Sequence, residues 1–206
     1  MANLENRSIG VFIDGGYFAK INEALHDKFN LNINIKALFR FIPELIGKFE
    51  EIDVKRLFIT ESHYYRGRYR VNDAQSKHLL FSERKFEDSL IENDIIIHYK
   101  HLREVQGSRG TTVIEKGIDT WFALDTYEMT LYRDFDYVVL ISGDADHEML
   151  ARKLKALKTH VILLTWDTAD TGSTSMLLSE EACTHIEIKQ MTEKDPGLLK
   201  RLCIQI

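Results

Sequence analysis

The stretch YVVLISGDADHEML, from Tyr137 to Leu150, carries the pattern that decides the fold of this chain. It opens with an uninterrupted apolar run, passes through a Ser-Gly-Asp turn and continues into a segment expected to be helical. A continuous apolar run of strand length is typical of a strand buried on both faces, as strands in parallel sheets are. The stretch therefore predicts a central strand at Tyr137–Ile141 and a helix at Ala145–Leu157.

The same order of parts recurs along the chain. IGVFI, at Ile9–Ile13, is followed by two glycines and a segment in which Phe18, Ile21 and Leu25 recur at helical spacing. Such alternation predicts an α/β fold with a mostly parallel central sheet flanked by helices. Further strands are expected at Lys55–Thr60, Ile95–Lys100, His160–Trp166 and Thr184–Ile188, and further helices at Ile35–Phe49, at Ala74–Glu92, from about Gly117–Asp119, and at Ser173–Ala182.

Three segments lie outside this alternation. ESHYYRGRYRVND, at Glu61–Asp73, is polar enough to predict a solvated loop, and His101–Ile114 is expected to form a hairpin that turns at Gly107–Gly110. The tail from Met191 onward has no clear assignment. We therefore expect one domain over residues 1–190, followed by an unassigned tail at 191–206.

Composition limits the kind of protein. The 206 residues are 44% hydrophobic and 29% charged, which is ordinary for a globular chain. Cys183 and Cys203 form no CxxC pair, so a cysteine zinc site is not expected, and Cys183 is expected to be a small core residue. Without a signal-like N-terminus or a long apolar run, the sequence favours a cytoplasmic protein. Its net charge of −5 means that a nucleic-acid partner would need a local basic patch.

Acidic residues gather at the predicted strand ends. Asp14 follows the first strand, Asp144 and Asp146 follow the Tyr137–Ile141 strand, and Asp119 opens the helix before that strand. In parallel sheets the carboxyl ends of the strands share one edge, where ligands bind. Crowded carboxylates repel one another, and their oxygens suit a hard cation such as Mg2+ or Mn2+. The alternative remains that each Asp is only a helix cap or turn former.

Two further residues are predicted to support these acids rather than to bind the metal. Asp125, six residues beyond Asp119, points about 120° away around an ideal helix. Ser142 lies in the turn just before Asp144. His147, next to Asp146, is expected to shape the start of its helix, with a role in protonating a leaving group as the alternative.

Four ordered segments of the chain together resemble the NYN domain family, in its LabA-like branch of the PIN-like nucleases. They are VFIDGGYF (Val11–Phe18), EKGIDTWFALD (Glu115–Asp125), YVVLISGDADHEML (Tyr137–Leu150) and STSMLLSEEACTHIEI (Ser173–Ile188). The resemblance implies a Rossmann-like PIN fold and a metal-dependent ribonuclease.

By this resemblance the catalytic and metal-holding acids are Asp14, Asp119, Asp144 and Asp146, and Asp125 matches a further acid common in the family. The chain departs from the family in two places. Gly16 stands where many relatives carry Asn, which removes a polar contact to metal-bound water or substrate, and His147 replaces the usual Phe.

Candidate nucleic-acid contacts lie in HYYRGRYR, at His63–Arg70. Arginines can pair with phosphates and tyrosines can stack on unpaired bases, so this segment is predicted to grip a single strand. The alternative is a solvated loop whose tyrosines pack on its own helix. The predicted contacts in this segment are Arg66, Arg68, Arg70 and Tyr65. Lys116, in the turn before Asp119, is a further candidate for a phosphate contact, with the alternative that it only balances that acid.

These observations favour a metal-dependent endoribonuclease that acts on single-stranded or locally unpaired RNA. A non-catalytic RNA-binding or scaffold protein on the same fold is the main alternative. A haloacid-dehalogenase-type phosphatase is less favoured, because Gly16 stands where such enzymes carry a second Asp two residues after the nucleophile. Acceptance of DNA, the number of metal ions and homo-oligomer formation stay open.

Overall fold

The computed structural model of the chain describes residues 5–107, 110–167 and 174–205. Its centre is a parallel sheet of six strands in the order β4-β3-β1-β7-β8-β9. The strands are β1 (Arg7–Asp14), β3 (Leu57–Arg68), β4 (Ile96–His101), β7 (Tyr137–Ile141), β8 (His160–Thr165) and β9 (Thr184–Glu187). The predicted α/β class and mostly parallel sheet are therefore confirmed.

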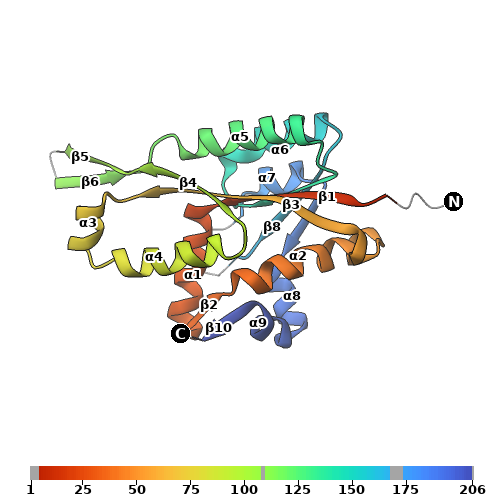
Figure 1. Ribbon diagram of the computed structural model, residues 1–206, viewed down its shortest axis with the longest axis horizontal. Coiled ribbons are helices and arrows are strands. Elements are labelled where there is room, and N and C mark those ends of the chain that lie inside the picture. Colours follow the sequence, from red (N-terminus) through yellow and green to blue (C-terminus); the bar gives the residue numbers. More distant parts are fainter. Residues whose placement is uncertain (1–4, 108–109, 168–173, 206) are drawn as a thin grey trace.

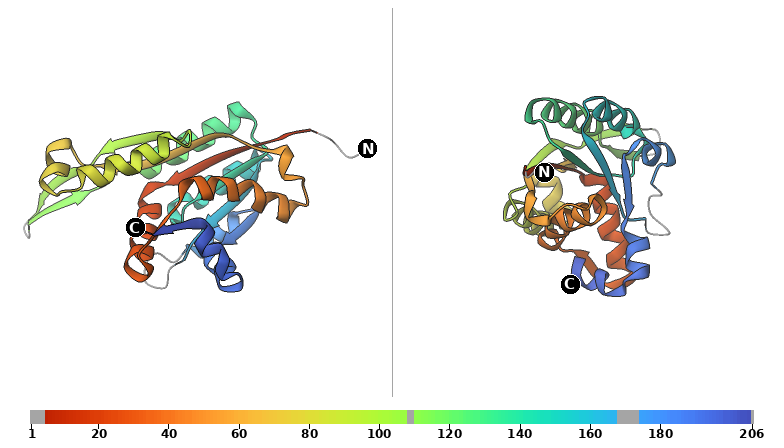
Figure 2. Two further views of the ribbon diagram at one scale, coloured as in Figure 1. Left: turned by 60° about the horizontal axis from the view of Figure 1, so that its bottom comes forward. Right: turned by 90° about the vertical axis from the view of Figure 1, so that its right-hand side faces the viewer.

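Helices cover both faces of the sheet (Figures 1 and 2). Above it, in the view of Figure 1, lie α5 (Ile118–Arg133), α6 (Glu148–Ala156) and α7 (Met176–Glu181). Below it lie α1 (Gly15–Phe29), α2 (Ile35–Glu50), α4 (Leu80–Ile91), α8 (Ile188–Lys194) and α9 (Pro196–Leu202). This three-layer arrangement is the Rossmann-like architecture that a PIN-type fold requires.

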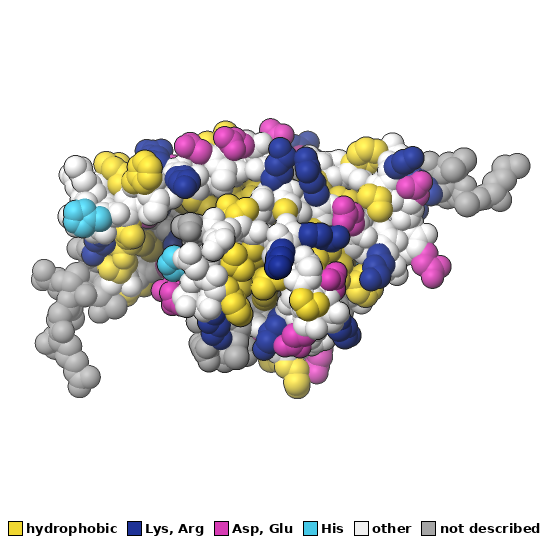
Figure 3. Space-filling view, turned by 90° about the horizontal axis from the view of Figure 1, so that it is seen from below, with side chains coloured by type: hydrophobic (Ala, Val, Ile, Leu, Met, Phe, Trp, Pro, Cys, Tyr) yellow, Lys and Arg dark blue, Asp and Glu magenta, His cyan; other side chains and the backbone are white. Residues whose placement is uncertain are grey.

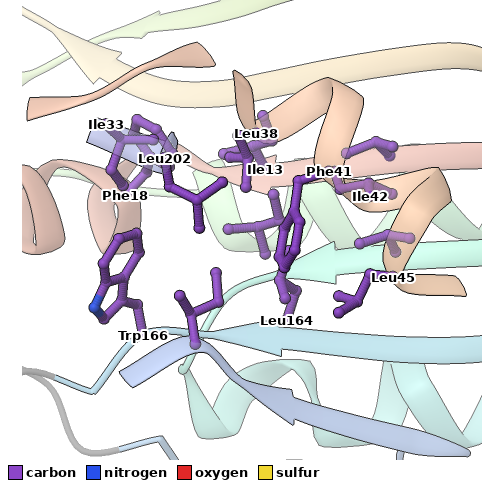
Figure 4. Packing of buried hydrophobic residues seen from close by; sticks show 14 of the residues in the cluster. Ile13, Phe18, Ile33, Leu38, Phe41, Ile42, Leu45, Leu164, Trp166 and Leu202 are labelled. Carbon is purple, nitrogen blue, oxygen red and sulfur yellow. The ribbon is translucent and has the colours of Figure 1, made fainter. Parts of the chain in front are cut away.

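Each face of the sheet has its own hydrophobic core. Along β7, Val138 and Leu140 face the upper core while Val139 and Ile141 face the lower one, and all four are buried. Figure 4 shows the lower core, where side chains of α2 pack toward the strands. Burial on both faces explains why this strand reads as a continuous apolar run.

Two predicted elements were wrong in extent. β3 continues eight residues past Thr60 to Arg68, so the polar segment is not a solvated loop in its first half. There it pairs with β1 on one side and β4 on the other, which satisfies its backbone, and the four consecutive side chains from Ser62 to Tyr65 are buried. The predicted long helix is divided into α3 (Val71–Ser76) and α4, with His78 between them in a left-handed conformation at φ 57°.

The remaining segments complete the fold. The predicted hairpin is present as β5 (Arg103–Gly107) and β6 (Gly110–Ile114), whose turn at 108–109 lies outside the described residues. In the tail, β10 (Cys203–Gln205) pairs antiparallel with β2 (Leu31–Ile33). Leu198 and Leu202 of α9 enter the lower core, so the tail is packed on the domain.

Three smaller points concern the last helix and strand, the short 3-10 turns and Cys183. The predicted strand at Thr184–Ile188 is β9, and the helix before it is α7, while Ser173 lies outside the described residues. The helix after Asp144 begins with the one-turn 3-10 segment η2 (Ala145–His147), and η1 (Val54–Arg56) is a second such turn before β3. Cys183 is exposed, so its predicted core position was wrong.

Candidate active site at the carboxyl ends of β1 and β7

Asp14 lies where β1 ends and α1 begins. Its Oδ1 accepts hydrogen bonds from the backbone N–H groups of Gly16 at 2.9 Å and Tyr17 at 3.1 Å, so it is a helix cap as the alternative interpretation held. Its Oδ2 accepts a hydrogen bond from the Ser142 hydroxyl at 3.0 Å. Because Ile13 pairs with Ile141 in the sheet register, the residues that follow β1 and β7 meet at one edge. Capping and a role in the site are therefore compatible.

Ser142 links this carboxylate to the turn after β7. The side chain is fully buried, its oxygen accepts a hydrogen bond from the Asp144 backbone N–H at 3.2 Å, and it lies 2.9 Å from Nδ1 of His147. Asp144 in turn caps η2 by accepting from the Asp146 backbone N–H at 3.0 Å. The Asp144 and Asp146 side chains are exposed to solvent. The turn thus holds two carboxylates beside Asp14 and leaves them accessible.

Asp119 approaches the same edge from the first turn of α5. Burial raises the pKa of its carboxyl group, and the negative charges of Asp14, Asp144 and Asp146 raise it further, while His147 acts in the opposite direction. Mutual repulsion of this kind requires the carboxylates to be close together. The structure thus brings the four predicted acids into one electrostatic site.

Glu115 is an additional acid that the sequence analysis missed. It follows β6 directly and accepts a hydrogen bond from the backbone N–H of Gly67 at the end of β3. Burial raises the pKa of its carboxyl group, the Gly67 hydrogen bond lowers it, and Asp119 and Asp14 raise it. Asp14 was identified because it directly follows a predicted strand, and the same position after the predicted hairpin would have identified Glu115.

This arrangement of acids at the strand ends can be compared with known proteins. A family model described as the NYN domain matches residues 8–189. The chain belongs to the NYN domain family. NYN domains are PIN-like nucleases, which in general use divalent metals and act on nucleic acids.

Two further comparisons complete the picture. None of the curated proteins matches the chain. A crystal structure of a protein of unknown function from Vibrio parahaemolyticus RIMD 2210633 is similar, with a TM-score of 0.60 and 18% sequence identity. The similarity covers 91% of this chain and 96% of that chain, and it supports the fold.

The donor chemistry of this NYN domain fits a divalent metal. Carboxylate oxygens are the ligands that Mg2+ and Mn2+ prefer, and a cation would offset the burial and the neighbouring negative charges that raise the pKa of Asp119. Within the described ranges, however, no three His, Cys, Asp or Glu side chains stand together around one ion position. The exposed side chains of Asp144 and Asp146 would have to turn toward Asp14 and Asp119 to enclose a metal.

Asp125 is not brought to the four acids. Its Oδ2 accepts a hydrogen bond from the Tyr65 hydroxyl at 3.2 Å and lies 3.9 Å from Nδ1 of His98. The Tyr65 ring is stacked on His98 and contacts Phe122 edge to face. The geometry therefore assigns Asp125 to a network between α5 and the sheet.

The predicted nucleic-acid contacts are divided by β3. Tyr65 is fully buried, so the expectation that it stacks on a base was wrong for this conformation. Arg66 and Arg68 are half-buried and line a pocket, whereas Arg70 and Lys116 are exposed. Alternation along β3 places Tyr65 on the opposite face from Arg66 and Arg68. Arg70 lies beyond the end of β3, and Lys116 lies between β6 and α5.

A further basic residue was missed. Gly117 has φ 80°, and a Cβ built on it would lie 2.8 Å from Nζ of Lys100 at the end of β4. Lys100 thus lies beside the turn that leads to Asp119.

The lower face of the molecule shows basic and acidic side chains interspersed (Figure 3). Among the described residues, no helix is long and apolar enough to cross a membrane.

Proposed function

We propose that the chain is a metal-dependent endoribonuclease of the LabA-like branch that cuts single-stranded or locally unpaired RNA in the cytoplasm. The observation that carries the proposal is that Ser142 joins Asp14 to the turn that carries Asp144 and Asp146 at the carboxyl ends of β1 and β7. Burial and these three acids also raise the pKa of Asp119 at the same edge. Crowded carboxylates are unfavourable in the free protein, and a bound cation relieves their repulsion. The membership in the NYN family supports nuclease chemistry at this edge.

In this proposal Asp14, Asp119, Asp144 and Asp146 hold one or two Mg2+ or Mn2+ ions. A metal in such a site activates water for attack on phosphorus and stabilises charge on the leaving oxygen. Asp14 is fixed in place by the N-terminus of α1 and by Ser142, so its carboxylate needs little reorganisation. Ser142 orients Asp14 and the turn that carries Asp144.

The two departures from the family pattern have different consequences. His147 is buried, is hydrogen-bonded to Ser142 and packs on Phe122 with ring centroids 4.4 Å apart. It therefore takes the packing role expected of Phe and also supports Ser142. At Gly16, a Cβ would lie 3.3 Å from Asp14 Oδ1 and 4.0 Å from Glu115 Oε2. We propose that Glu115 supplies the polar group that Asn supplies in relatives.

The experiment compares purified wild type with Asp144→Asn on end-labelled single-stranded RNA and DNA, with Mg2+, Mn2+ or a chelator. Asn keeps an oxygen to accept from the Asp146 N–H, so the turn is expected to stay folded while a metal ligand loses its charge. Glu128→Gln on the exposed face of α5 is the matched control for loss of one negative charge.

The expected result is internal cleavage of RNA that needs metal, persists in Glu128→Gln and falls at least about 100-fold in Asp144→Asn. RNA that is bound and left intact by both wild type and control would replace this proposal with the non-catalytic binding protein. Hydrolysis of a small phosphomonoester, with trapping of an aspartyl adduct at Asp14, would replace it with the phosphatase. Equal cleavage by wild type and Asp144→Asn would show a contaminating nuclease.

A further inference from the structure

A pocket of 320 Å³ lies under the end of β3, between the N-terminal half of α1 and α4. Figure 1 shows these two helices below the sheet. Both aromatic and polar side chains line the pocket. The lining side chains that bear on the argument are Ala19, Arg66, Arg68, Tyr69, Glu83 and Phe86.

The pocket begins beside the acidic site. A Cβ built on Gly15, the residue after Asp14, would lie 2.8 Å from the Cβ of Arg66. The Arg66 guanidinium also acts to lower the pKa of Glu115, which shares the electrostatic field of Asp14 and Asp119. Arg66 therefore stands at the junction between the pocket and the acids, where a phosphate joined to a ligand in the pocket would meet a positive charge.

The pocket wall holds polar atoms that lack protein partners. Within the described part of the chain, five buried side-chain atoms have no hydrogen-bond partner, and three of them are Arg68 Nη2, Glu83 Oε2 and Glu87 Oε1 in this wall. Arg68 and Glu87 still face each other as an ion pair at 3.2 Å. Glu83 Oε2 accepts no hydrogen bond, and the nearby charge of Arg66 acts on this carboxylate only electrostatically. A buried carboxylate oxygen without a donor is costly, which points to a ligand that supplies N–H groups.

We propose that this pocket binds one unpaired guanine nucleotide of the RNA strand, with its base toward Glu83 and its phosphate at Arg66. The inference rests on the proposed function, because it takes RNA as the ligand. Guanine presents two adjacent donors, N1–H and N2–H, which match the two oxygens of one carboxylate. Adenine, uracil and cytosine place an acceptor beside their donor on that edge, and the acceptor would meet the negative charge.

The remaining walls suit a single base. Phe86 and Tyr69 are partly exposed and offer ring surface, and unpaired bases are commonly bound on aromatic side chains. The volume is near the lower end of the roughly 300–1,000 Å³ typical of small-molecule pockets, so it suits one nucleotide rather than a longer stretch. With the phosphate at Arg66, the bond presented to the acids is the one next to the guanine.

The test measures binding without metal, so that cleavage plays no part. Fluorescence anisotropy in a chelator compares labelled octauridylates that carry one central guanine, inosine or adenine. Inosine lacks the N2 amino group and therefore removes one of the two proposed donors. Wild type is expected to bind the guanine oligonucleotide at least about 10-fold more tightly than the adenine one, with inosine between them.

Two variants of the pocket and one control test whether the guanine preference arises there. Glu83→Gln is expected to remove it, whereas Asp88→Asn, on the exposed side of the same helix, is expected to retain it. Ala19→Phe fills the pocket from α1 and should remove the preference with Glu83 intact. Thermal melting verifies that each variant is folded.

Equal binding of the three oligonucleotides, absence of binding, or a guanine preference that survives in folded Glu83→Gln and Ala19→Phe would overturn the inference. Adding Mg2+ or Mn2+ to the same oligonucleotides distinguishes a failure of the guanine pocket from a failure of the proposed nuclease function. Cleavage without guanine preference would refute the pocket alone. Guanine preference without cleavage would refute the nuclease and leave the pocket standing.

Discussion

The two ends of strands β1 and β7 carry carboxylates in opposite situations. At the amino ends, Asp136 accepts hydrogen bonds from the Ser8 N–H at 2.8 Å and the Ser8 hydroxyl at 3.1 Å, and pairs with the Arg7 guanidinium. These partners lower its pKa against the opposing effect of burial. At the carboxyl ends, Asp119 has a raised pKa because burial and neighbouring acids oppose its charge. The same pair of strands therefore has one end whose carboxylate is paired and one end whose carboxylates are crowded, and the crowded end is the one that we propose binds a cation.

The largest expected effect separates capping from chemistry at Asp14. In Asp14→Asn the amide oxygen can still accept from the Gly16 and Tyr17 N–H groups, and Asn is a good helix cap, so the fold should be kept. RNA cleavage is expected to fall at least about 100-fold because a metal ligand loses its charge. Asp136→Asn, at the other end, should retain the wild-type rate under conditions where it is folded. A rate that survives in Asp14→Asn would make Asp14 a cap only.

The second effect is on the free energy of unfolding, at the amino ends of the strands where Asp136 is paired. Asp136→Asn removes charge-assisted hydrogen bonds and is expected to lower the free energy of unfolding at pH 7 by about 1 to 2 kcal/mol. Because the folded pKa of Asp136 lies below its usual value, its contribution is present above that value and is lost as the pH falls through the folded pKa. Denaturant melts of wild type and variant should therefore differ at pH 7 and converge in strong acid. Asp134→Asn, two residues away and exposed, is the control and should melt like wild type at both pH values.

A smaller effect of opposite sign on the free energy of unfolding is expected at the carboxyl ends of the strands, where acids surround Asp119. The pKa of Asp119 is raised on folding, so its charge destabilises the folded state as the pH rises through the interval above its usual value. Asp119→Asn should therefore be more stable than wild type at pH 7, and equal to it below about pH 4. The dipole of α5 favours a negative charge there, and the Asp119 side chain is exposed so that solvent screens the repulsion; after both offsets we expect a gain of at most about 0.5 kcal/mol. Glu128→Gln in the same helix should show no such gain, and a loss of stability in Asp119→Asn would contradict the account.

The sequence predicted the strand β7 and the turns at the carboxyl ends of the strands well because their signals are local. The apolar run at Tyr137–Ile141 defined β7, and the acids that directly follow strands were found from their positions alone. Ser142 was placed next to Asp14 and Asp144 by the parallel register, which the alternation of strands and helices implied. Whether these acids bind a metal stays a prediction.

The parts that were missed depend on partners distant in sequence. His63 and Tyr65 were predicted to lie in a loop because the surrounding segment is polar and aromatic. Their backbone instead pairs with β1 and β4, and their side chains are buried. Glu115 directly follows the predicted hairpin, but its position beside Gly67 at the end of β3 depends on how distant parts of the sheet are placed. The tail had no periodicity long enough to read, and its structure depends on β2 and the lower core.

The central claim, that the carboxyl-end acids form a metal site, is tested most directly by thermal melting with increasing Mn2+. Wild type and Asp136→Asn are expected to rise in melting temperature together, since a ligand at 100 times its Kd adds about 2.7 kcal/mol of stability. Asp144→Asn is expected to gain much less at the same Mn2+ concentrations. A wild type that does not respond to Mn2+, or an Asp144→Asn variant that responds equally, would contradict the account.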